Sequence, residues 1–298
     1  MRKARKFNDL SKVTIVGVGL LGGSIGLAVR AAGSRCLRVG IGRRRRSIER
    51  ARRLGAIDQA TTSFRRGLRD AELVIVATPL GQFEQVFTAM AGHLPAGCVI
   101  TDVGSAKVQP TRLAEGILPP RVRFVGSHPI AGSEKAGVEF ARAELFCNAP
   151  CIVTPSTTSD RASVGLVVSF WRALGCRVRR LSPERHDRLM ASLSHLPHMV
   201  ASCLVLLAAE DRALDLAGPG LMDTTRIASG QPALWCDILR CNRRPALLAL
   251  RRLQKRLTDF GRALQAPDDK ELMKILRSAK RRRDALIRSK PARRERQP

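Results

Sequence analysis

A glycine-rich turn near the N-terminus constrains the fold more than any other feature of the sequence. A β-branched run at residues 13–16 leads into Gly17, Gly19 and Gly22, and a helical segment is expected over residues 24–32. In a Gly-x-Gly-x-x-Gly turn between a strand and a helix, the first glycine allows the tight turn and the second lets the backbone approach a pyrophosphate. The third glycine allows close packing of the helix against the strand. The sequence therefore predicts a dinucleotide-binding turn.

The remaining cofactor contacts are expected around this turn. The start of a helix carries unpaired N–H groups that bind phosphate, and this assigns Leu20 and Leu21 to the phosphates. A buried strand predicted over residues 73–77 ends at Thr78 and Pro79. Because ligands of open α/β sheets bind beyond the carboxyl ends of strands, we expect Thr78 and Pro79 to contact the cofactor as well.

Strands and helical segments alternate over the first 183 residues. Further strands are predicted over residues 37–41, 98–103, 122–125, 151–154 and 176–181. This alternation is typical of a mostly parallel sheet covered by helices on both faces. From Glu184 to Leu286 the apolar residues recur at helical spacing and no strand is expected. The predicted fold is an α/β Rossmann-type domain at residues 1–183, followed by an all-α domain at residues 184–298 whose basic tail frays from about residue 280.

The basic composition raises the question of nucleic-acid binding. The chain has 53 Lys and Arg against 25 Asp and Glu, a formal charge of +28, and two basic clusters lie at Arg43–Arg46 and at residues 277–296. However, the sequence contains no Tyr and only 4% aromatic residues, so the stacking surface of a single-strand binder is missing. No helix-turn-helix, zinc-finger or RNP-like motif is present. We expect a small-molecule ligand and keep a basic Rossmann-fold nucleic-acid-binding regulator as a remote alternative.

Hydropathy and cysteine usage bear on location and metal binding. No apolar run reaches the roughly 18 residues of a membrane span, so no membrane association is expected. The eight cysteines include no Cys-x-x-Cys pair, which predicts reduced thiols in a cytoplasmic protein. Cys147 and Cys151 have metal-like spacing without a companion histidine, and no metal site is expected.

The end of the second predicted strand bears on cofactor choice. Enzymes that use NAD usually carry an acid there to bind the ribose 2′-hydroxyl, whereas this chain has Gly42 followed by Arg43–Arg46, with no acid before Glu49. A carboxylate would repel a 2′-phosphate, and an arginine binds one through two parallel hydrogen bonds. We therefore expect Arg43 and Arg44 to contact the cofactor, and NADP to be preferred over NAD.

Three histidines lie near the ends of predicted strands or helices. His128 comes just after the strand at residues 122–125, where an imidazole can accept a proton near neutral pH. His195 and His198 flank Pro197, which suits the first turn of a helix, so they are expected near a positive helix end that favours an anionic ligand.

One arginine is expected in an apolar helical segment of the second half. Arg226 has apolar neighbours, and a charge there is costly unless it is paired. Its partner would be a carboxylate ligand or Asp223.

These segments together resemble a known family. The matching segments are Gly17–Gly22, Asp102–Lys107, Gly126–Glu134, Ser194–His198 and Asp223–Ala228. In this order they look like the prephenate dehydrogenases of tyrosine biosynthesis, over about residues 12–265. The resemblance implies a Rossmann domain and a helical domain that forms a homodimer, with the active site in the cleft between them. It also implies hydride transfer to NAD(P) with loss of CO2, which gives 4-hydroxyphenylpyruvate.

The resemblance also implies roles for individual residues. His128 matches the catalytic histidine that bonds the ring hydroxyl of prephenate, and Ser105 is similarly placed to bond that hydroxyl and the histidine. Arg226 matches the arginine that binds a substrate carboxylate. His195 and His198 match polar residues that line the same pocket.

Two weaker correspondences and two further rival functions remain open. Glu134 matches a gating or orienting acid, and Trp235 matches a tryptophan near the cleft but serves equally well as a core anchor. Arogenate dehydrogenases share the fold and often use NADP, which Arg43–Arg46 favours, while His198 favours the prephenate type. A generic hydroxyacid or imine reductase shares the cofactor turn but needs none of the histidine segments.

Overall fold

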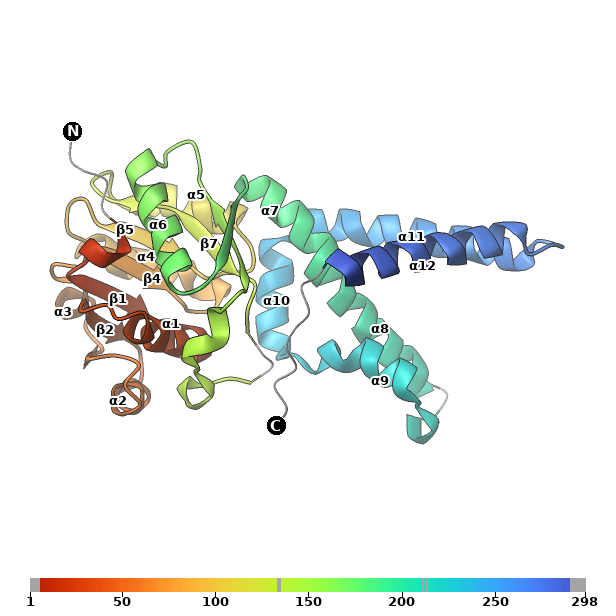
Figure 1. Ribbon diagram of the computed structural model, residues 1–298, viewed down its shortest axis with the longest axis horizontal. Helices are drawn as coiled ribbons and strands as arrows, with labels where there is room; N and C mark the ends of the chain where they lie inside the picture. The colour runs from red at the N-terminus through yellow and green to blue at the C-terminus, as the bar shows by residue number, and fades with distance from the viewer. Residues whose placement is uncertain (1–5, 133–134, 211, 213, 290–298) are drawn as a thin grey trace. The chain divides into compact units, whose positions relative to one another are not determined.

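The structure, a computed structural model, describes residues 6–132, 135–210, 212 and 214–289. Its central feature is a six-stranded parallel sheet in the order β3-β2-β1-β4-β5-β6 (Figure 1). The strands are β1 (Lys12–Val16), β2 (Leu37–Ile41), β3 (Gln59–Thr61), β4 (Leu73–Val76), β5 (Val99–Asp102) and β6 (Arg123–Phe124). Every residue of β4 is buried, as expected for a central strand covered on both faces.

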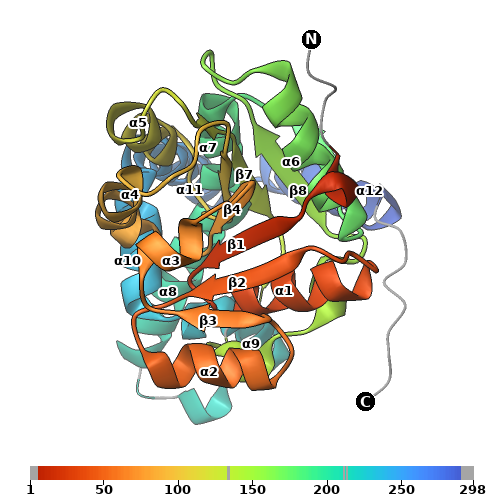
Figure 2. The same cartoon turned by 90° about the vertical axis from the view of Figure 1, so that its left-hand side faces the viewer.

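Helices cover both faces of this sheet, as Figure 2 shows. They are α1 (Leu20–Ala31), α2 (Arg45–Arg53), α3 (Phe64–Leu68), α4 (Phe83–Ala91), α5 (Val108–Ile117) and α6 (Arg161–Ala173). Apolar residues of α1, α2 and α6 form one buried core with β1, and those of α3, α4 and α5 form a second core with β4. The α/β fold with a mostly parallel sheet, predicted from the alternating pattern, is confirmed.

A small second sheet adjoins the first and carries a candidate site residue. β7 (Gly126–Pro129) pairs antiparallel with β8 (Pro150–Thr154), which pairs parallel with β9 (Arg177–Arg180). The sequence did not predict β3 or β7. In addition, α1 begins at Leu20 rather than at residue 24, so Gly22 and Gly23 lie inside the helix.

The described elements after β9 are helical. They include α7 (Pro183–Met190), α8 (Leu196–Glu210), α9 (Pro219–Thr225), α10 (Pro232–Cys241), α11 (Arg243–Gln265) and α12 (Lys270–Ser289). α8 begins at Leu196, beside Pro197 as expected, but it has no free start. A π-helical turn, Ala191–His195, joins α7 to α8, so Pro197 lies inside a continuous helix from Pro183. The argument that His195 and His198 sit at a positive helix end therefore fails.

The continuous helix Pro183–Glu210 has 28 residues and is long and apolar enough to cross a membrane by length and composition alone. On that measure, the expectation that no apolar segment reaches the length of a span is wrong. The same helix carries several buried polar side chains, His186, Asp187, His195 and His198 among them.

The chain forms two compact units, Met1–Ala246 and Leu247–Pro298. The change from α/β to helical structure occurs at Pro183, while the helices up to α10 belong to the first unit, so the domain boundary at residue 183 stays a prediction. α12 continues to Ser289, and the fraying expected from about residue 280 stays a prediction. Residues 290–298 lie outside the described residues.

Candidate active site

A cleft of about 480 Å³ opens above the carboxyl ends of β1, β2 and β4. It is lined by six of the predicted cofactor residues, which are Gly17, Gly19, Arg43, Arg44, Thr78 and Pro79. The other three are not among its lining residues: Leu20 starts α1, Leu21 packs against the core, and Gly22 lies beneath the turn.

The geometry of the three glycines fits a dinucleotide. Gly17 has a φ of +92°, and a Cβ atom there would lie 2.9 Å from the Ala77 carbonyl. A Cβ at Gly22 would lie 2.1 Å from the Gly17 oxygen, so this position allows the helix to pack on the turn. A Cβ at Gly19 would meet no atom within 4 Å, which leaves the space that a pyrophosphate needs. The turn therefore has the three features predicted from its spacing.

Two arginines and a threonine hydroxyl line this cleft. Arg43 and Arg44 are exposed at the end of β2, and none of the described lining residues is Asp or Glu. Among the described residues, the buried hydroxyl of Thr78 has no hydrogen-bond partner, so it is available to a ligand.

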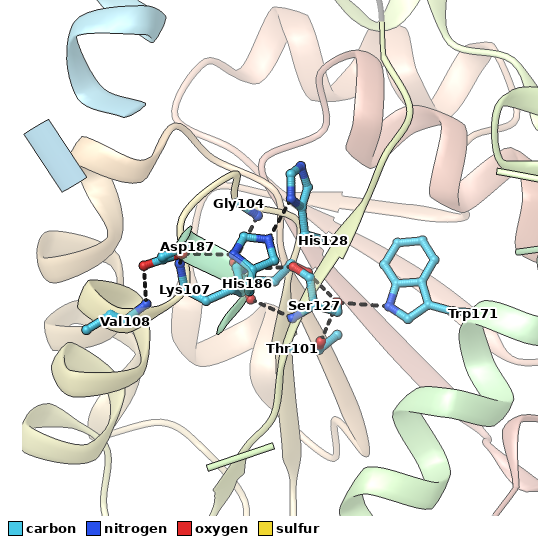
Figure 3. A network of polar contacts seen from close by, with 10 residues as sticks. Thr101, Gly104, Lys107, Val108, Ser127, His128, Trp171, His186 and Asp187 are labelled. Carbon is cyan, nitrogen blue, oxygen red and sulfur yellow. Dashed lines mark hydrogen bonds and ion pairs between the residues drawn. The ribbon is translucent and has the colours of Figure 1, made fainter. Parts of the chain in front are cut away.

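His128 lies on β7 and is held by a rigid backbone. Its register partner on β8 is Ile152. The neighbouring Ser127 donates its N–H to Asp102 Oδ1 over 3.0 Å, and its hydroxyl accepts a hydrogen bond from the Trp171 indole over 2.8 Å (Figure 3). These contacts fix the strand that presents the His128 ring.

The His128 ring joins a chain of polar contacts that the sequence did not reveal. Its Nδ1 lies 2.9 Å from Nε2 of His186, and Nδ1 of His186 lies 2.8 Å from Oδ1 of Asp187 (Figure 3). Asp187 also accepts the backbone N–H of Lys107 over 2.7 Å and that of Val108 over 2.9 Å at the start of α5. Both residues lie in the polar start of α7, where the sequence gives no signal that sets them apart.

A buried ion pair lies beside this chain. The Lys107 ammonium and the Asp102 carboxylate are both fully buried and in contact, and Lys107 Nζ also donates to the Ser127 carbonyl over 2.8 Å. Asp102 further accepts the N–H of Gly104 over 2.8 Å. Burial lowers the pKa of Lys107 from its ordinary value, and Asp102 opposes that shift. The sequence placed Lys107 in a motif without giving it a role.

The electrostatic surroundings keep His128 uncharged near pH 7. Burial lowers its pKa well below 6.5, and His186, Lys107 and His195 lower it further. The pKa of His186 is also lowered, chiefly by burial, although Asp187 acts in the opposite direction. A neutral imidazole at position 128 is a group that can accept a proton.

A second histidine, His195, is held by a hydrogen bond from Asn242. The Asn242 side-chain amide lies 2.8 Å from the Asp187 backbone oxygen and 3.0 Å from His195 Nδ1. A carbonyl oxygen only accepts, so the NH2 group of Asn242 donates to both, and His195 Nδ1 is an acceptor. Burial lowers the pKa of His195 to about 4. Its Nε2 therefore carries the proton, and within the described residues this buried N–H has no partner.

His198 and Trp235 are brought together by stacking. Their ring centroids lie 3.6 Å apart with an interplanar angle of 10°. His198 Nδ1 is buried without a hydrogen-bond partner in the described part of the chain. Trp235 is thus a platform for His198, which neither of its two predicted roles included.

Other predicted residues are not joined to this network. Ser105 is partly exposed, and no hydrogen bond links its side chain to His128 or to any other described residue. Arg226 lies exposed in the 3-10 turn Arg226–Ser229 and forms no ion pair with Asp223 or another described acid, so a carboxylate ligand as its partner stays a prediction. Glu134 lies outside the described residues.

The fold and the site together define a dinucleotide-dependent oxidoreductase, with a glycine-turn cleft and a neutral histidine on β7. The chain belongs to the prephenate dehydrogenase family. Residues 25–180 match the family model "Prephenate dehydrogenase, nucleotide-binding domain", and residues 182–278 match "Prephenate dehydrogenase, dimerization domain".

Individual relatives agree with this assignment. The chain is 34% identical over 280 residues to a prephenate dehydrogenase of Bacillus subtilis. The aligned region covers 92% of this chain and 76% of the Bacillus protein. The chain is also similar to a crystal structure of prephenate dehydrogenase from Aquifex aeolicus in complex with hydroxyphenyl propionate and NAD+. The TM-score is 0.84 and the identity 32%, and the match covers 93% of this chain and 98% of the Aquifex chain. The crystal structure of Synechocystis arogenate dehydrogenase has a TM-score of 0.82, 28% identity, and coverage of 92% and 99%.

Proposed function

We propose that the protein oxidises and decarboxylates prephenate to 4-hydroxyphenylpyruvate, with NADP as the preferred hydride acceptor. The observation that carries this proposal is the neutral His128, whose Nδ1 is occupied by His186 and whose other ring nitrogen is left to a substrate. In this reaction the nicotinamide ring accepts a hydride from the substrate. The base that receives the substrate proton must come from the protein.

The proposed chemistry balances with a single base. His128 Nε2 takes the proton of the ring hydroxyl, and the ring carbon that bears this hydroxyl gives up a hydride. The C–C bond to the ring carboxylate then breaks, and CO2 leaves. The electron pair of that bond enters the ring, the carbonyl π pair moves to the ring oxygen, and this oxygen takes the proton back from His128. Because aromatisation supplies the driving force, the protein contributes orientation, one weak base and carboxylate recognition.

Other residues bind and orient the substrate in this proposal. The unpartnered His195 Nε2–H donates to a substrate oxygen, since a buried donor without a partner is costly until a ligand accepts it. The exposed Arg226 guanidinium binds a substrate carboxylate, and His198 lines the pocket on its Trp235 platform. The roles of Ser105 as a partner of the hydroxyl and of Glu134 as a gating acid rest on the family resemblance.

A spectrophotometric assay tests the reaction. Reduced nicotinamide formation is followed with prephenate and with arogenate, each with NADP and with NAD. His128→Asn is expected to lower kcat by roughly 10²–10⁴-fold while cofactor affinity stays near that of the parent. Unchanged kcat in His128→Asn, or no turnover with any of the four pairs, would refute the proposal.

The choice of NADP rests on Arg43 and Arg44 in the cleft and on the absence of an acid among its described lining residues. Replacing both arginines by Ala removes charge-assisted hydrogen bonds worth about 1.5–3 kcal/mol each. We expect kcat/KM for NADP to fall at least tenfold while that for NAD changes little. A parent enzyme that prefers NAD would contradict this assignment.

Arogenate dehydrogenase is the second candidate, and the similarity to the Synechocystis arogenate dehydrogenase favours it. The two substrates differ in the side chain away from the reacting ring, where one carries a keto group and the other an amino group. The base and the hydride chemistry are shared, so the ratio of kcat/KM for the two substrates decides between the candidates.

We also propose that the protein forms a homodimer through its helical region. Residues 182–278 match a dimerization domain, and large apolar side chains are exposed on its helices. Within the first unit they include Leu193, Leu206, Leu207, Leu216 and Met222. Light scattering coupled to size-exclusion chromatography measures the mass, and a monomer at micromolar concentration would contradict the proposal.

A further inference from the structure

We propose that His186 and Asp187 form a positioning pair that fixes His128 with its proton on Nδ1 and its lone pair on Nε2. This inference deepens the proposed function and rests on it, since it names the residues that make His128 a base in the proposed reaction. His186 and Asp187 do not themselves contact the reacting atoms in this scheme.

The direction of each hydrogen bond follows from Asp187. Its carboxylate accepts two backbone N–H groups at the start of α5, those of Lys107 and Val108, and these donors suit an ionised acceptor. The contact of 2.8 Å from His186 Nδ1 to Asp187 Oδ1 is therefore an N–H donating to a carboxylate. In a neutral imidazole the other nitrogen is then an acceptor, which assigns the lone pair of His186 to Nε2.

The same reasoning passes one ring further. His186 Nε2 lies 2.9 Å from His128 Nδ1, and an acceptor at His186 requires a donor at His128. His128 Nδ1 thus carries the proton, and its Nε2 carries the lone pair. If His186 were doubly protonated, it would donate to His128 Nδ1, and His128 Nε2 would carry a proton and lose its function as a base.

The groups that face these rings favour the neutral form of His186. Around His128 they are His186 from α7, His195 from the π-helical turn, Lys107 from the start of α5 and the Cys151 thiol from β8. The buried Lys107 ammonium disfavours a second cation nearby, and its own charge is compensated by Asp102. Asp187 is the nearest acid to His186, and one oxygen of its carboxylate bonds the imidazole N–H.

The pair has a consequence for the reaction step itself. When the hydroxyl proton reaches His128 Nε2, the ring becomes a cation whose Nδ1–H already points at His186. The negative charge of Asp187, transmitted through the His186 ring, stabilises that cation without any rearrangement. When the ring becomes aromatic, the proton returns from Nε2 to the ring oxygen, so the pair ends each turnover in its starting state.

Two substitutions at His186 separate positioning from packing. His186→Phe keeps a planar ring but removes the acceptor, whereas His186→Gln keeps an oxygen that can accept the His128 N–H. We expect His186→Phe to lower kcat about 10²-fold, in the range found for residues that orient a catalytic ring, while KM and cofactor affinity change less than threefold. His186→Gln should recover most of the lost kcat. Wild-type kcat in a folded His186→Phe, or equal losses in both variants, would overturn the proposal.

The tautomer is measured directly on the intact protein, without turnover. Selective 15N-histidine labelling resolves five imidazoles, and single variants assign their signals. A proton on Nδ1 of His128 supports the proposal, and a proton on Nε2 overturns it, even if His186→Phe does not fold. If the wild type turns over none of the substrates, the proposed function fails, while the tautomer measurement still decides the positioning pair.

Discussion

Replacing Lys107 by Met removes the cation of a fully buried ion pair while keeping a side chain of similar length. Asp102 would keep its hydrogen bonds from the backbone N–H groups of Gly104 and Ser127, but its charge would lose the ammonium beside it. Breaking a buried pair by removing one partner costs about 3–5 kcal/mol, because an uncompensated charge stays in a low-dielectric interior. We therefore expect a large loss of stability from one substitution.

The size of that loss can be followed by thermal unfolding. For chains of 150–250 residues, 1 kcal/mol shifts Tm by about 2–4 °C, so Lys107→Met should lower Tm by about 6–20 °C. The control is the double variant Lys107→Met/Asp102→Asn, which removes the stranded charge and should regain part of the loss. Circular dichroism at 222 nm, in one buffer for all variants, gives the comparison. A Tm within about 2 °C of the parent, or a double variant less stable than the single one, would refute the reasoning.

The remaining predictions concern the cofactor turn and the second histidine. Gly19→Ala should keep the parent Tm but weaken cofactor binding, which calorimetry measures. Gly22→Ala should lower the free energy of unfolding by about 1–3 kcal/mol or more, because its Cβ would lie 2.1 Å from a backbone oxygen. A stability loss in Gly19→Ala and a binding loss alone in Gly22→Ala would contradict the assigned roles. His195 has a pKa of about 4 in the folded protein, against about 6.5 in the unfolded chain. Only the unfolded chain binds the proton between these two pH values, so the free energy of unfolding should fall by about 3 kcal/mol as the pH falls from about 6.5 to 4. Urea unfolding should therefore show a smaller pH slope in His195→Asn than in the parent, and equal slopes would contradict it. Asn242→Asp should raise KM for the substrate about tenfold. A carboxylate at position 242 would accept a proton from His195 Nδ1, so that Nε2 would no longer carry the N–H that donates to the substrate. An unchanged KM in steady-state kinetics would contradict the proposed donor.

The sequence predicts well those parts of the fold that are specified by local patterns. β2 is predicted at residues 37–41, as observed, because Leu37, Val39 and Ile41 alternate along a short segment, which favours a strand. The glycine turn was predictable because each of its three steric requirements excludes a side chain at a defined spacing. By contrast, β7 consists of Gly, Ser, His and Pro, which have little strand preference, and it is a strand because β8 pairs with it.

The site was only partly predictable for the same reason. His128 followed a predicted strand and carried a family motif, so its position gave it a role. His186 and Asp187 lie 58 and 59 residues further along the chain, in a helix whose start looks like an ordinary polar first turn. Only the packing of α7 against the start of α5 shows that His186 contacts His128 and that Asp187 contacts His186.

Pro197 shows how a residue that misled the sequence interpretation shapes the site. Proline has no N–H to donate to the carbonyl four residues before it, and the helix accommodates it next to the π-helical turn Ala191–His195, which takes in one extra residue. At 3.6 residues per turn, His186 and His195, nine positions apart, would lie about two and a half turns apart and so on opposite faces. One extra residue in the turn reduces the effective spacing to about eight, or roughly 2.2 turns, which brings both imidazoles to neighbouring faces. The helix can therefore direct His186 to His128 while Asn242 holds His195, and a straight α-helix over the same residues would separate them.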